Sequence, residues 1–323
     1  MLVECHSFQN VCIACLKEMK WVVRTMYIIE NANILKDKEL QTCSLLINED
    51  RIMAKQTEFK RYQLIKMNSD PYIMTPSYIL LGSNIPHQGS FQDLKTCLIE
   101  QFLLKGCTTL FTYVDLFYEN ELTEKIKKAK TALISSPIDF IIGVKIPVRL
   151  ITPSFIRSCK KEKIPAIFVE VQEPEELEKI PWGWIREAMF PFNSPFIPII
   201  SSSQKKEAMA VMSKWKDIML REKIPALYEV VEENQPLSIP VLNKIGLYLQ
   251  KGSLMNGTEL SYNLYVKGRE IKKVDEAGLF HYHSDRLVVT VHKGKVVRSG
   301  NKVLFKPGNG EHVKVITPSF FSL

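Results

Sequence analysis

The order of hydrophobic and polar positions divides the chain into three parts. Residues 26–75 contain short apolar runs separated by polar turns, including a hairpin predicted at 43–54. From residue 76 to 250, short apolar runs alternate with stretches of helical period. After residue 251 the short apolar runs and turns return. A strand–helix repeat is therefore flanked at both chain ends by β-rich sequence.

The middle part is typical of a parallel sheet or a barrel, because its strands alternate with amphipathic helices. The sequence predicts six strand–helix units, fewer than the eight of a full barrel. In the helix expected at 204–221, Met209, Met212, Trp215 and Met219 recur at helical spacing and are predicted to face the core. The strands are expected at 78–81, 108–114, 138–144, 166–171, 197–200 and 226–231, and the other helices at 91–104, 119–133 and 174–190.

Composition excludes several classes of protein. The 323 residues are 46% hydrophobic and 24% charged, as in globular proteins of about two domains. No apolar run approaches the ~20 residues of a transmembrane helix. Residues 1–25 mix apolar and charged side chains, unlike a secretory signal, and we interpret them as a leader without regular structure. Seven cysteines do not form a disulfide framework, which favours a reduced, cytoplasmic protein.

The net charge of +8 is concentrated at one end of the chain. Residues 251–323 contain 12 basic and 6 acidic side chains. A basic end can attract nucleic acid, but the interleaved aromatic residues of single-strand binders are missing. We therefore predict a solvated, Lys-rich β surface and no nucleic-acid partner.

Several motifs occur in the order found in one enzyme family. Residues 47–52 (INEDRI) resemble I-x-(E/D)-G-K-I. Residues 74–84 (MTPSYILLGSN) resemble V-x-P-G-F-I-D-x-H-x-H, and 106–109 (GCTT) resemble G-x-T-T. Residues 245–260 (IGLYLQKGSLMNGTEL) resemble G-x-x-P-x-K-G-x-I-x-x-G-x-D-A-D, and 290–297 (TVHKGKVV) match T-x-x-x-G-x-V-V. Together they resemble the dihydroorotase and hydantoinase branch of the metal-dependent amidohydrolases.

This resemblance implies an α/β fold made of a shortened (β/α) TIM-like barrel and a small composite β-sandwich. Residues 76–250 would form the barrel, and residues 26–75 and 251–323 would form the sandwich. The family reaction is hydrolysis of a cyclic amide by metal-activated water, at the carboxyl ends of the barrel strands.

The metal ligands of the family are not found at the corresponding positions. Gly82 and Asn84 stand where the resemblance implies two histidines, and no histidine lies between residues 88 and 280. The stretch 166–171 also lacks the lysine that some members carboxylate. A zinc site needs three or four suitable ligands, so we predict no metal and no other cofactor.

Polar side chains still follow the predicted strands and could line a pocket. Among these polar side chains, Lys145 could hold an anion, Asp115 and Glu170 could pair as acid and base, and His87 could act as a lone base. Alternatively, these residues simply end strands and begin loops. The pocket candidates are Asn84, His87, Tyr113, Asp115, Lys145, Glu170 and Ser201.

Two further groups have spacings that metals use. Cys5, His6, Cys12 and Cys15 lie within 11 residues, and His281 and His283 form the one His-x-His pair. We interpret the first group as part of the leader and the second as surface or packed imidazoles in a β region.

Two functions remain open. The first is a non-catalytic amidohydrolase-like protein that binds a small molecule or a protein partner and possesses no metal centre. The second is a hydrolase of C–N bonds in cyclic amides, with an altered or metal-free site. Neither a membrane nor nucleic acid is expected as a partner, and a homo-oligomer is left open.

Overall fold

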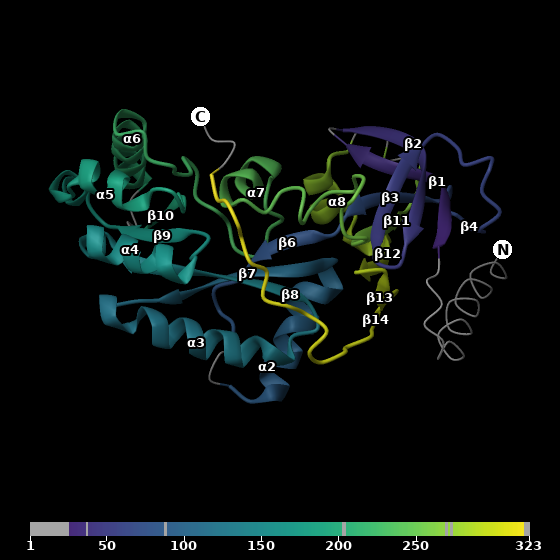
Figure 1. Ribbon diagram of the computed structural model, residues 1–323, viewed down its shortest axis with the longest axis horizontal. Helices are drawn as coiled ribbons and strands as arrows, with labels where there is room; N and C mark the ends of the chain where they lie inside the picture. The colour runs from purple at the N-terminus through teal and green to yellow at the C-terminus, as the bar shows by residue number, and fades with distance from the viewer. Residues whose placement is uncertain are drawn as a thin grey trace.

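The computed structural model describes residues 26–36, 38–86, 89–201, 205–268, 271 and 274–319. Its strands form two separate sheets, one of nine strands and one of five. Figure 1 shows the smaller sheet among most of the helices and the larger sheet at the other end of the molecule. The mixed α/β fold that the strand–helix pattern predicted is therefore observed.

The nine-stranded sheet combines both ends of the described chain. Strands β5 and β11 join the two contributions, and they pair antiparallel from Tyr262 opposite Pro76 to Val266 opposite Tyr72. The strand order is β14-β13-β12-β11-β5-β1-β2-β3, with β4 also paired to β1. The bounds are β1 Met26–Lys36, β2 Glu39–Asn48, β3 Arg51–Gln56, β4 Ile65–Asn68, β5 Tyr72–Pro76, β11 Tyr262–Val266, β12 Leu287–His292, β13 Lys295–Ser299 and β14 Lys302–Val303.

The five-stranded sheet is parallel and runs in the order β10-β9-β8-β7-β6. Helices connect its successive strands. Helix α4, for example, begins where the Thr152 side chain accepts a hydrogen bond from the Phe155 amide, and Pro153 occupies the first helical turn. The strands are β6 Tyr78–Leu81, β7 Cys107–Asp115, β8 Asp139–Pro147, β9 Ile167–Val171 and β10 Phe196–Ile200; the helices are α2 Phe91–Cys97, α3 Leu122–Ala132, α4 Pro153–Glu162, α5 Trp182–Met189 and α6 Lys205–Arg221.

The segment predicted as a sixth strand, 226–231, does not form one. Ala226 makes a single bridge to Phe196 of β10, and the chain then crosses to the opposite edge of the sheet. There the Asn234 amide donates to the Leu81 carbonyl, and the Leu237 amide donates to the Ile79 carbonyl. This closing segment, residues 226–237, links the two edges of the curled parallel sheet. Its apolar run serves packing rather than strand pairing.

The concave face of the parallel sheet is filled by later parts of the chain. Helix α7 (Ile239–Ile245) and the C-terminal tail, residues 310–319, pack there, and Leu242, Val313 and Val315 are buried against the strands. The tail pairs with the start of β8 through a bridge between His312 and Phe140. In Figure 1 this tail, in yellow, runs from β14 past the parallel sheet to the vicinity of α7.

Three other local predictions differ from the structure. The helix expected at 174–190 is divided, because Pro181 separates a 3₁₀ turn, Pro174–Lys179, from α5. The pair His281 and His283 lies at the end of helix α8, Glu276–Tyr282, and not in a β region. In the stripe of α6, Trp215 and Met219 are fully buried, whereas Met209 is 65% exposed.

None of the helices among the described residues has both the length and the apolar character needed to cross a bilayer.

Candidate functional site

The concave faces of the five parallel strands end in polar side chains. Because alternate strand residues point to opposite sides, the concave face carries every second residue, and its buried members include Leu81, Phe111, Ile141, Phe168 and Ile197. The same alternation continues at the carboxyl ends of the strands into a strand-end cluster made of Ser83, Tyr113, Asp115, Lys145, Glu170 and Ser201.

Lys145 lies at the centre of this cluster, between carboxylates of the two neighbouring strands. Its Nζ is 3.5 Å from Asp115 Oδ1 and 3.4 Å from Glu170 Oε1. Ser201 Oγ donates a hydrogen bond of 2.9 Å to Glu170 Oε1. Burial lowers the pKa of Lys145, but Glu170 and Asp115 outweigh it and raise this pKa above its usual value. The structure thus brings together four of the residues that we singled out from the sequence.

A second group of polar side chains continues the cluster toward β6. Tyr113 packs its ring on Phe168, with 4.6 Å between ring centroids. Ser83 Oγ donates a hydrogen bond to a carboxylate oxygen of Glu233 in the closing segment. Burial raises the pKa of Tyr113, an effect that Ser83 opposes and Glu233 reinforces. Glu233 extends the cluster from outside the sheet.

Sequence reasoning missed Ser83 and Glu233 for different reasons. Ser83 lies two residues beyond the buried Leu81, so the strand period would have identified it. Glu233 follows no strand, and it reaches the cluster only because the closing segment crosses from β10 to β6. No local pattern in the sequence marks that crossing.

The remaining predicted candidates contribute less. Asn84 is exposed just beyond β6, and His87 lies outside the described residues, as do Cys5, His6, Cys12 and Cys15. Phe117 and Tyr118, which could have blocked the strand ends, are 59% and 68% exposed.

Gly82 faces the helical layer rather than the concave side. A Cβ atom built on Gly82 would lie 2.5 Å from Phe102 Cζ and 3.2 Å from Leu110 Cδ1, so no larger side chain fits there without a shift. The concave positions at the end of β6 are therefore Leu81 and Ser83. Neither pair of alternate residues at the end of β6, Gly82 with Asn84 or Leu81 with Ser83, contains a histidine.

The transition-metal centre of the amidohydrolases does not fit the strand ends described here. The donors are carboxylates and hydroxyls, and the Lys145 ammonium lies within 3.5 Å of two of the carboxylates. Zinc in proteins is held mainly by imidazole and thiolate together with carboxylate. A lysine cation at the centre of the site would repel a metal ion.

A charged cluster lies at the opposite end of the parallel sheet, where β8 begins. Asp139, Glu259 and His292 lie close enough to share a metal ion, since their ligating atoms are all within 4.8 Å of one another. In the described part of the chain, no other group of three or more histidine, cysteine or carboxylate side chains does so. The Lys251 ammonium bonds to both carboxylates, and Lys293 Nζ is 2.8 Å from Asp139 Oδ1. Both carboxylates therefore already have cationic partners, as in a buried ion-pair network.

Burial would raise the pKa of Asp139, but His292 and Lys251 hold it well below its usual range. His292 is fully buried, with Nε2 at 3.5 Å from Asp139 Oδ1 and Nδ1 at 3.8 Å from Glu259 Oε1. Two residues of the family-like stretch 245–260, Lys251 and Glu259, thus meet the first residue of β8. In barrel folds, this amino-terminal face serves stability and not catalysis.

No protein-family model matches the sequence, and no protein with a curated description matches it. Solved structures do match its fold. A dihydropyrimidinase from Brevibacillus agri NCHU1002 superposes with a TM-score of 0.60 at 10% identity, covering 91% of this chain and 99% of the other. A D-hydantoinase from Bacillus sp. AR9 gives 0.58 at 9% identity, covering 90% and 99%. A prolidase gives 0.52 at 9% identity, covering 85% and 100%.

These similarities establish the fold, since the identities are too low to carry an activity. The resemblance to the amidohydrolases, predicted from motifs of the sequence, is confirmed at that level.

Proposed function

We propose that this protein is a non-catalytic, amidohydrolase-like binding protein that holds a small cyclic amide at the strand-end cluster without hydrolysing it. The observation that carries the proposal is the position of Lys145, which pairs with Asp115 and Glu170 where the family pattern calls for metal ligands. The missing imidazoles at the end of β6 support the same conclusion.

The charges of the cluster favour a ligand that donates hydrogen bonds. Asp115, Glu170 and Glu233 contribute three carboxylates, and Lys145 contributes one ammonium group that two of them already neutralise. Carboxylates are acceptors only, so the N–H groups of a cyclic amide or ureide suit them better than an anion does. The names dihydropyrimidinase and D-hydantoinase identify such rings as the compounds on which those structural neighbours act.

Calorimetric titration with hydantoin and with a dihydropyrimidine tests the proposal. We expect binding without turnover. The Lys145 ammonium would donate a charge-assisted hydrogen bond, worth about 1.5–3 kcal/mol, to a ring carbonyl of the ligand, so the Lys145→Met variant should bind about tenfold or more weakly. Lys216→Met, which removes an exposed lysine of α6, is the matched control. Absence of binding by both rings, or equal binding by the Lys145→Met variant, would refute the proposal.

One observation favours the alternative, a C–N hydrolase with an altered or metal-free site. Ser201 Oγ donates to Glu170, and Glu170 lies 3.4 Å from Lys145, so a hydroxyl group is within reach of a carboxylate base. Steady release of ring-opened product, abolished by Glu170→Gln or Ser201→Ala, would replace the binding function by this one.

The division into domains, the cellular location and the oligomeric state are also proposals. We propose that the parallel sheet is a shortened TIM-like barrel formed by residues 76–250, and that residues 26–75 and 251–323 form a composite β-sandwich. Limited proteolysis tests this division. In the described part of the chain, Cys43, Cys97, Cys107 and Cys159 are free, which supports a cytoplasmic location. Light scattering on purified protein would decide whether it forms a homo-oligomer.

A further inference from the structure

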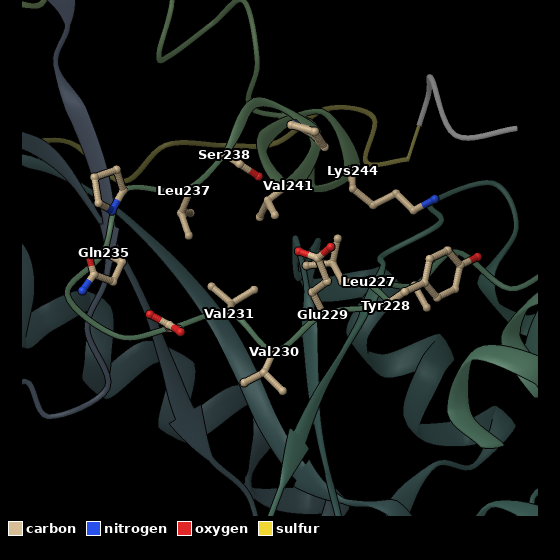
Figure 2. A pocket seen from close by; sticks show the side chains of 14 residues that line it. Leu227, Tyr228, Glu229, Val230, Val231, Gln235, Leu237, Ser238, Val241 and Lys244 are labelled. Atoms are coloured by element: carbon tan, nitrogen blue, oxygen red, sulfur yellow. The ribbon is translucent and has the colours of Figure 1, made fainter. Parts of the chain in front are cut away.

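A cavity lies beside the parallel sheet, along the closing segment. It has a volume of about 540 Å³, within the range of ligand pockets, and is bounded by the closing segment and by helix α7. Neither Lys145 nor its partners Asp115 and Glu170 line it. Figure 2 shows Leu237 and Val241 on one wall and Val231 facing them. Its walls are therefore largely apolar.

Three charged side chains line this cavity, the Lys244 ammonium and the carboxylates of Glu229 and Glu232, and they do not pair with one another. Lys244, on the last turn of α7, is half-buried. Glu229, on the closing segment, is exposed and points its carboxylate between the walls (Figure 2). None of these three side chains makes an ion pair or a hydrogen bond within the described part of the chain. Burial lowers the pKa of the Lys244 ammonium, as expected for a cation that has lost water without gaining a partner.

An unpaired cation and two unpaired carboxylates on one largely apolar cavity are complementary to a molecule that carries both charges. A ligand carboxylate would pair with Lys244 and a ligand ammonium with Glu229, while an aliphatic body would contact Val231, Leu237 and Val241. A ligand with only one charge would leave the other protein group without a partner, and it would gain only part of this energy.

We propose that this cavity binds a small apolar zwitterion, an aliphatic α-amino acid or a dipeptide of such residues. None of Lys145, Asp115 and Glu170 lines this cavity, so the inference does not depend on the function proposed above.

Calorimetry with four probes tests this inference on the wild-type protein. Leucine carries both charges, 4-methylpentanoate lacks the ammonium, isoamylamine lacks the carboxylate, and leucyl-valine separates the two charges by one peptide unit. We expect leucine or the dipeptide to bind about tenfold or more tightly than either singly charged analogue. Equal affinity for all four probes, or no binding by any of them, would overturn the proposal.

Two substitutions assign the contacts. Lys244→Met keeps the aliphatic stem and should weaken zwitterion binding about tenfold, whereas Glu229→Gln should weaken it but leave 4-methylpentanoate binding unchanged. Lys216→Met and Asp217→Asn, on the exposed face of α6, are the matched controls. If Lys244→Met fails to fold, Val241→Trp provides a second test, because it fills the cavity and should abolish binding. Unchanged zwitterion affinity in folded Lys244→Met or Val241→Trp protein would contradict the proposal.

Discussion

Replacing Lys251 by methionine tests whether the buried ion-pair network at the start of β8 stabilises the fold. The Lys251 side chain is only 7% exposed, and its carboxylate partners Asp139 and Glu259 are 1% and 15% exposed. Methionine keeps most of the aliphatic volume and removes the charge. The two carboxylates then retain Lys293 as the near cation, at 2.8 Å from Asp139.

Breaking a buried ion pair by removing one partner costs about 3–5 kcal/mol, because the other charge stays buried without compensation. Lys293 and the Glu311 amide, which donates to Asp139 at 2.8 Å, still stabilise Asp139. We therefore expect the lower end of this range, about 3 kcal/mol of lost unfolding free energy. Since a domain has only about 5–15 kcal/mol in total, the effect is easily measured.

Urea unfolding at pH 7, followed by tryptophan fluorescence, provides the measurement. The exposed Lys216→Met control should change stability by no more than about 0.5 kcal/mol. The double variant Lys251→Met with Asp139→Asn should lose less than the sum of the single losses, by about 2 kcal/mol, because it removes a cation and an anion together. A cost below about 1 kcal/mol for Lys251→Met, or strict additivity, would refute a stabilising network.

The pH dependence of the same network has a definite sign. Because the pKa of Asp139 is lower in the folded protein than its unfolded value of about 3.9, the charged form favours folding. Its contribution is present above about pH 4 and is lost as the pH falls toward the folded pKa. The stability difference between wild type and Asp139→Asn should accordingly stay constant from neutral pH down to about 5 and narrow below about 4.

Two further predictions concern a close backbone contact and a half-buried histidine. Gly310→Ala should lower the unfolding free energy measured in urea by about 2 kcal/mol, because the new Cβ would lie 1.9 Å from the Ile138 carbonyl oxygen. In the control Gly183→Ala, in α5, the new Cβ meets nothing within 4 Å, so this variant should be neutral or stabilising. Equal effects of the two substitutions would contradict the packing argument. Burial, with Lys130 and Lys314, lowers the pKa of His312 to about 4, so the neutral imidazole favours folding and stability should decline as the pH falls from about 6.5 toward that value. A His312→Gln variant should show a shallower decline in thermal melts over this range, and a decline as steep as that of wild type would assign the pH dependence to other groups.

The sequence alone determined the local elements and the polar ends of the strands. Strand–helix alternation is a property of consecutive residues, so it predicted the parallel sheet and located Asp115, Lys145, Glu170 and Ser201 at strand ends. Parallel strands place their carboxyl ends at one edge, and this is why Asp115, Glu170 and Ser201, far apart in sequence, gather around Lys145.

The tertiary structure decided what closes the sheet and what fills its concave side. The run 226–231 has the composition of a strand, yet it bridges two sheet edges, because α7 and the tail with Val313 and Val315 occupy the interior beside it. The same packing brings Glu233 to the strand-end cluster and creates the cavity beside Lys244. The ion pair between Asp139 and Lys251 likewise joins residues 112 positions apart. No periodicity records such contacts, because they depend on the free energy of packing the whole chain.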